Sequence, residues 1–245
     1  MSLESRHVGN PASPTRKAYG AQVRVGSLEA TKRVAVVLMT IDHINKYVLH
    51  ESQHWMFATG RSVMPLFVLV LAFNLARPEA ARSGAIGRTL VRLVVSALLA
   101  TPAYCAMGQL PGGWWPLNIL WTLAAITSIV WLWDVRTVTH RMAAVAIFAT
   151  GGAVVEFWWP AIALGLACWW YFRTASWPAL ACAAAALGSL GLINGNQWAL
   201  VALPVWLIAS RLATPLPRMR AFFYVYYPAH LWALWGIGTL LARLT

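Results

Sequence analysis

Long apolar segments recur along almost the whole chain, and they limit its possible folds more than any other feature. A helix crosses the hydrocarbon core of a bilayer, about 30 Å thick, with about 20 apolar residues. Of the 245 residues, 60% are hydrophobic and 11% are charged, whereas soluble domains average about 25% charged residues. The sequence therefore predicts an all-α polytopic membrane protein.

The apolar segments predict about nine transmembrane helices. Turn-forming residues separate several of them, at Pro111-Gly112-Gly113, Trp158-Trp159-Pro160 and Asn194-Gly195-Asn196. Several segments are shorter than about 20 residues, so one of the short central ones is a candidate re-entrant segment. The expected ranges are 34–50, 61–76, 88–107, 116–133, 142–158, 160–173, 177–193, 197–210 and 221–242.

The basic residues predict how these helices are oriented. Cytoplasmic loops of membrane proteins carry an excess of Lys and Arg. If the N-terminus is cytoplasmic and the C-terminus periplasmic, only Lys46, Arg61 and Arg243 of the 19 Lys and Arg residues fall outside cytoplasmic segments. We therefore expect a flexible basic cytoplasmic tail over 1–33, followed by a transmembrane domain over 34–245. The tail does not have the pattern of a signal peptide.

Other function classes are disfavoured by composition. The net charge of +12 follows from the basic connections between helices, so we expect no nucleic-acid partner. Cys105, Cys168 and Cys182 lack the spacing of a disulfide framework or a zinc site, and we predict no metal.

Ionisable residues within the apolar segments are the candidates for function. Asp42 and His43 lie about ten residues into the first segment, and His230 lies equally far into the last, so all three are expected about 15 Å deep. A charge at that depth is costly and marks a functional site by default. Arg61 opens the second segment, and a purely structural pairing of Asp42 with Arg61 is the alternative.

Two further ionisable residues have simpler explanations. Lys46 can extend toward the outer interface. Glu156 is expected near the outer end of the segment 142–158, as an interfacial acid.

Several of these residues belong to a pattern that resembles the TraX-like (pilin acetylase) family, and among its members the TrbP conjugal-transfer proteins. The resemblance runs from about residue 32 to the end of the chain. It rests on Asp42-His43-Ile44, Gly60-Arg61 with Met64-Pro65-Leu66-Phe67, Asn118-Ile119-Leu120, Gln197 with Ala202-Leu203-Pro204, and the segment 222–231.

The resemblance implies a bacterial inner-membrane protein linked to conjugation, whose type member acetylates the N-terminus of a pilin. The family is also distantly similar to the membrane acyltransferase-3 group, in which a histidine of the first span and an arginine near the second are essential. Those positions are His43 and Arg61 here, and the family pattern adds Asp42, Tyr227 and His230. The implied partners are a pilin subunit in the membrane, other conjugative transfer or type IV secretion components, and the lipid bilayer.

As a hypothesis, His43 is the base of an acyl transfer, with His230 or a water as its direct partner. Arg61 or Tyr227 stabilises the developing oxyanion. Arg88, Arg92 and Arg141 hold the phosphates of acetyl-CoA, a donor that the resemblance implies.

Two other functions remain open. One is a non-enzymatic factor that holds pilin in the membrane. The other is a small proton-coupled transporter that uses Asp42, His43 and His230 as a relay.

Overall fold

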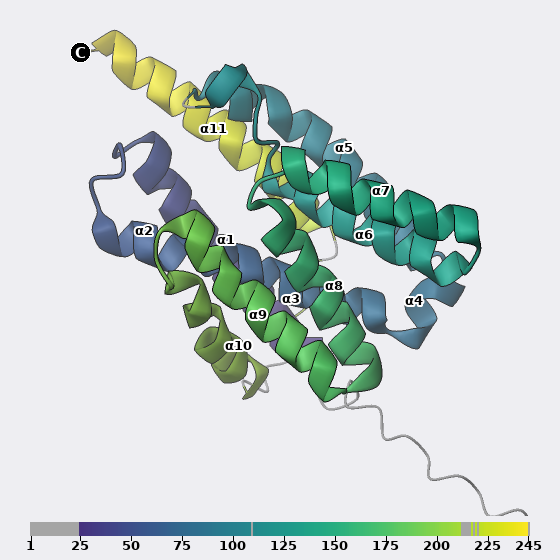
Figure 1. Ribbon diagram of the computed structural model, residues 1–245. Helices are drawn as coiled ribbons and strands as arrows, with labels where there is room; N and C mark the ends of the chain where they lie inside the picture. Colours follow the sequence, from purple (N-terminus) through teal and green to yellow (C-terminus); the bar gives the residue numbers. More distant parts are fainter. Residues whose placement is uncertain (1–24, 109, 212–216, 218, 220, 245) are drawn as a thin grey trace, which may run out of the picture.

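The protein folds into a bundle of helices (Figure 1). The computed structural model describes residues 25–108, 110–211, 217, 219 and 221–244. Within these residues every regular element is a helix, so the predicted all-α class is confirmed. The helices are α1 (Val25–Tyr47), α2 (His54–Gly60), α3 (Val63–Ala76), α4 (Pro78–Arg82), α5 (Ala85–Ala106), α6 (Ile119–Val135), α7 (Val138–Val154), α8 (Trp158–Thr174), α9 (Trp177–Asn194), α10 (Ala202–Arg211) and α11 (Phe222–Leu244), with short 3₁₀ turns at Pro111–Gly113 and Trp198–Val201.

Each predicted apolar segment coincides with a helix, and α2 and α4 are short additions on either side of α3. The first helix begins earlier than the sequence predicted. It starts at Val25, within the stretch expected to be a tail, because Leu28 and Ala30 are buried in the bundle. The rest of the predicted tail, residues 1–24, lies outside the described residues.

One predicted break is displaced. Trp158, Trp159 and Pro160 form the first turn of α8 instead of separating two helices. Proline is tolerated there because the first amides of a helix need no partner within the helix. The break lies at residues 155–157, so Glu156 belongs to a junction and not, as expected, to the preceding helix.

Three stretches are long and apolar enough to cross a membrane, namely His54–Ala76, Ala85–Ala106 and Trp177–Asn194. The surface of the bundle is also apolar, since Leu99, Leu192 and Ile208 are 57%, 88% and 63% exposed. Large exposed apolar surfaces are rare on soluble monomers. Both features indicate a membrane protein.

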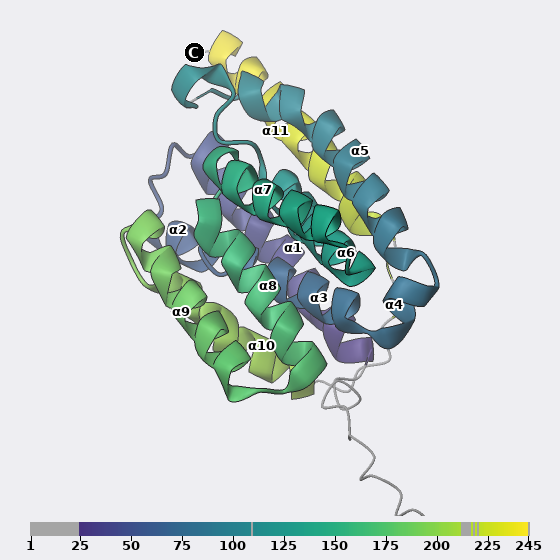
Figure 2. The same ribbon diagram turned by 45° about the vertical axis from the view of Figure 1, so that its right-hand side comes forward.

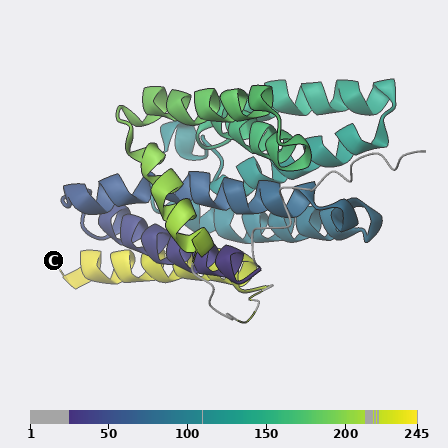
Figure 3. The same cartoon turned by 90° about the horizontal axis from the view of Figure 1, so that it is seen from below.

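The packing places α1 at the centre of the candidate site. This helix contacts α2, α3, α10 and α11, while α11 packs along α5. Seen from below, α1 (purple) and α11 (yellow) lie together on the side of the bundle opposite α9 (Figure 3). The first and last helices of the chain therefore share one interface, and the residues predicted for the site lie on both.

Candidate functional site

The centre of the site is a pair of histidines, one from each end of the chain. Nδ1 of His43 lies 2.7 Å from Nε2 of His230, and the two rings are nearly parallel, 9° apart. His230, one of the two partners expected for His43, therefore contacts it directly.

Hydrogen bonding assigns the protons on this pair. Nδ1 of His230 lies 3.1 Å from the carbonyl oxygen of Tyr226, and a carbonyl can only accept, so this nitrogen carries hydrogen. In the neutral ring Nε2 of His230 is then the acceptor, and Nδ1 of His43 donates to it. Nε2 of His43 consequently keeps its lone pair, which is the form of imidazole that can take a proton.

Tyr226 and Thr40, which the sequence analysis missed, support this arrangement. The hydroxyl of Thr40 donates to the carbonyl of Val36 at 2.8 Å, so the hydroxyl of Tyr226, 2.7 Å away, donates to Thr40. The Tyr226 ring stacks on His230 with centroids 5.2 Å apart. These contacts connect α11 to α1 one helical turn before the histidine pair. Tyr226 lies in the segment 222–231 of the family pattern, but that pattern does not indicate its contact with Thr40.

Tyr227 also contacts both histidines. Its side chain is buried, and its ring meets His43 and His230 edge to face, with centroids 6.2 and 5.3 Å apart. Its phenol interacts with the backbone of Ile119 at the start of α6. The aromatic ring of Tyr227, and not its hydroxyl, therefore contacts the two histidines.

Asp42 and Arg61 form an ion pair beside the histidines. Nη2 of Arg61 donates to the two carboxylate oxygens of Asp42 at 3.2 and 3.5 Å. Gly60 permits this approach, because a β-carbon at that position would overlap the Asp42 carboxyl. The guanidinium also lies 4.4 Å from the centre of the Phe57 ring, and its buried Nε has no hydrogen-bond partner within the part of the chain that the structure describes.

Glu156 is a third residue that the sequence did not place in the site. It follows α7 in a junction where its amide donates to the carbonyl of Leu117 at 2.8 Å and its own carbonyl accepts from Thr122 at 3.0 Å. Phe157 and Trp158, with φ of 63° and 52°, then turn the chain sharply.

The carboxyl of Glu156 interacts electrostatically with Lys46 and Arg61, so it joins the charged groups around Asp42.

The three arginines predicted to hold a donor divide between two places. Arg88 and Arg92 lie on α5, and the Arg92 guanidinium is 6.0 Å from the ring of Tyr224 on α11. Tyr224 lines a hollow of about 420 Å³ together with Asn74, Arg77 and Thr89.

Arg141 lies on α7, where its guanidinium is 5.6 Å from the ring of Trp133 on α6.

The fold and these contacts define a helical membrane protein with a partly buried histidine pair between its first and last helices, and a partly buried ion pair between α1 and the α2–α3 junction. The sequence profile of the family described as TraX protein matches residues 27–238. The chain belongs to the TraX family, which confirms the resemblance given above.

Two members of this family show how similar the chain is to known proteins. It is 30% identical over 227 residues to Protein TraX of Escherichia coli, with 88% of each chain covered. It is 34% identical over 127 residues to Protein TraX of Escherichia coli strain K12, covering 52% of this chain and 48% of that protein. No solved structure matches.

Proposed function

We propose that the protein is an integral acyltransferase of the bacterial inner membrane that acetylates a pilin subunit, with acetyl-CoA as donor, during biogenesis of a conjugative pilus. The observation that carries the proposal is the hydrogen-bond chain from the Tyr226 carbonyl through His230 to His43. It leaves Nε2 of His43 as a base at the centre of the bundle. Membership of the TraX family supports the choice of acceptor.

In the proposed reaction the donor supplies an acyl group as a thioester and leaves as a thiol. Nε2 of His43 takes the proton from the attacking group of the acceptor and passes it to the departing sulfur, so the enzyme ends unchanged. His230 accepts from Nδ1–H of His43 throughout and keeps the ring in the same orientation. The unpartnered buried Nε of Arg61 is the donor available to an oxygen that gains negative charge.

The donor is proposed to enter from the inner face, where residues suited to an anionic nucleotide gather. Arg77, Thr89 and Asn74 line the 420 Å³ hollow, and Arg92 lies against its Tyr224 wall. A second hollow shares Tyr224 with the first and extends to Lys32 and Phe223. We assign the phosphates to Arg92, which contacts the Tyr224 wall, and to Arg88 one turn before it on α5; neither is a lining residue of the hollow, whose lining also contains Glu79. Arg141 lies against Trp133 in a different part of the bundle.

The proposal is tested by the intact mass of the mature pilin from cells that carry the wild-type protein or a variant. The wild type is expected to add the mass of one acetyl group, and His43→Ala and Arg61→Ala to add none. His54→Ala is the matched control, because His54 contacts only Phe57 among the ring contacts observed in the described residues. Modification that persists in membranes containing His43→Ala would contradict the proposal. A pilin that co-purifies with the wild-type protein at unaltered mass would indicate a non-enzymatic assembly factor instead.

A further inference from the structure

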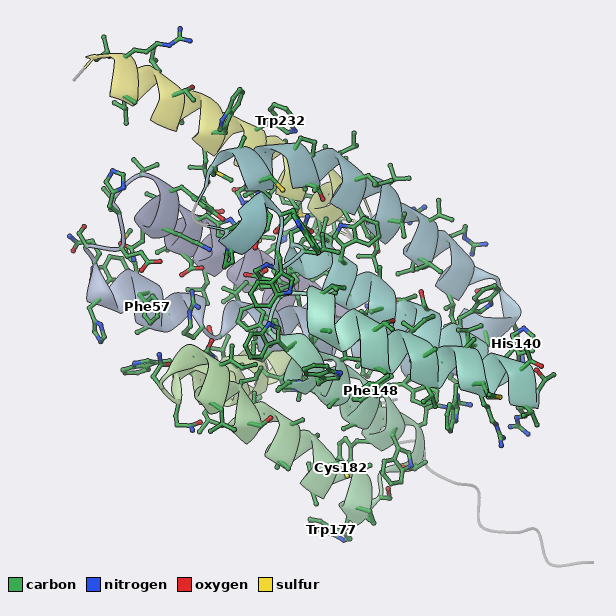
Figure 4. The ribbon with its side chains drawn as sticks, turned by 45° about the horizontal axis from the view of Figure 1, so that its top comes forward. Phe57, His140, Phe148, Trp177, Cys182 and Trp232 are labelled. Carbon is green, nitrogen blue, oxygen red and sulfur yellow. The ribbon has the colours of Figure 1, made fainter. Side chains whose placement is uncertain are left out.

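A long apolar groove opens between α7 and α9, away from the histidine pair. Its floor is formed by α6 and α8, on which α7 and α9 pack (Figure 2). The groove has a volume of about 550 Å³. Figure 4 labels Phe148 on α7 and Cys182 on α9, which line it from the two sides. The other lining residues include Val130, Val145, Leu166 and Ala167.

One end of this groove is positively charged. The first turn of α7 and the last turn of α8 lie at this end, and each contributes an arginine that stacks on a tryptophan of the lining. The guanidinium of Arg141 lies 5.6 Å from the centre of the Trp133 ring, and that of Arg173 lies 4.9 Å from Trp169. Arg173 also pairs with Asp134 at 2.6 Å, whereas no ion pair involves Arg141 among the described residues.

The groove also contains a polar atom that lacks a partner. Nε1 of Trp169, one of the lining residues, is buried and makes no hydrogen bond within the described part of the chain. Leaving a buried donor unsatisfied is costly. An ester or phosphate oxygen in the groove would satisfy it once the Trp169 ring turns toward the ligand.

We propose that this groove is a binding site for an anionic phospholipid, which places one acyl chain along the apolar floor and its phosphate between Arg141 and Arg173. The apolar lining suits an acyl chain, and Arg141, which has no carboxylate partner among the described residues, suits the phosphate. Charge distinguishes this site from the general apolar surface, which any lipid can cover. The inference does not depend on the acyltransferase activity.

The lipid that co-purifies with the protein tests the site. The protein is extracted in a mild detergent, and bound phosphatidylglycerol and phosphatidylethanolamine are quantified by mass spectrometry per mole of protein. We expect the wild type to retain phosphatidylglycerol preferentially. Arg141→Gln should weaken its retention about tenfold, as expected for the loss of one charge-assisted contact. Val145→Trp should displace it by filling the groove.

Arg136→Gln is the matched control, since it removes one charge from the adjoining α6–α7 turn, and among the described residues the arginines stacked on groove tryptophans are Arg141 and Arg173. This variant should retain lipid as the wild type does. Equal retention of the two lipids by the wild type, or equal losses in Arg136→Gln and Arg141→Gln, would overturn the proposal.

A second measurement separates a lipid from a free anion. Phosphatidylglycerol added in detergent is expected to raise the unfolding temperature of the wild type, and of Arg141→Gln less. Inorganic phosphate at the same concentration should raise neither. Stabilisation by inorganic phosphate alone would contradict a lipid site.

Discussion

At the scale of single residues, His230 is expected to act through His43. It accepts one hydrogen bond from Nδ1 of His43 and thereby fixes which nitrogen of that ring is basic. Without it, the two tautomers of His43 compete and the ring loses its fixed orientation. His230 is therefore a positioning residue in this account.

The first prediction follows from that role. His230→Ala should reduce acetyl transfer by about 10²-fold or more while leaving some activity, because a base is still present. His43→Ala should leave none. Rates measured with purified protein would show the difference, and equal loss in the two variants would argue against a positioning role for His230.

The second prediction concerns the close contact between Gly60 and Asp42. Gly60→Ala should push the Asp42 carboxyl away from Arg61 and destabilise the fold by about 1–3 kcal/mol, the usual cost of overpacking. Gly87→Ala on α5 is the matched control, since nothing lies within 4 Å of the added methyl group. Thermal unfolding in detergent compares the two. Similar stability of both variants would show that the contact at Gly60 can relax.

At the scale of elements, the junction between α7 and α8 brings an acid to the site without using a helix. The backbone amide of Glu156 donates to the Leu117 carbonyl, and its backbone carbonyl accepts from the Thr122 hydroxyl. Its carboxyl interacts electrostatically with Lys46 and Arg61. Left-handed conformations at Phe157 and Trp158 are costly for such residues. Strain of this kind clusters at functional sites.

Glu156→Gln supplies the third prediction. Folding should be preserved, because the junction is held by backbone groups that the substitution does not change. Acetyl transfer should fall about tenfold or more, since Lys46 and Arg61 then share Asp42 as their remaining counter-charge. Asp134→Asn, whose ion-pair partner is Arg173 at the end of α8, is the control. If its rate falls as far as that of Glu156→Gln, the effect is not specific to the junction.

The sequence predicted the positions of the helices better than the contacts between their side chains. Helix positions follow from apolar runs between turn residues, and the shared depth of His43 and His230 follows from counting residues along two helices. The roles of Glu156, Tyr226 and Thr40 depend on how α1, α6 and α11 pack, which no local pattern encodes. The early start of α1 was missed for a related reason, since its polar residues gave no sign that Leu28 would be buried.

At the scale of the whole molecule, the account requires a defined orientation in the membrane. The histidine pair must be reached by a donor from the cytoplasm and by a pilin from the periplasmic side. The fourth prediction is that alkaline phosphatase fused after residue 245 is active and that a fluorescent protein fused there is dark. Fusions at residue 136 should behave in the opposite way. The reverse result at either position would contradict the proposed topology.

The measurement that tests the central claim most directly is the transfer of label from radioactive acetyl-CoA to purified pilin by the purified protein in liposomes. The account predicts labelled pilin with the wild type and with His54→Ala, and none with His43→Ala. Labelled pilin with His43→Ala, or no label with a correctly folded wild-type protein, would contradict it.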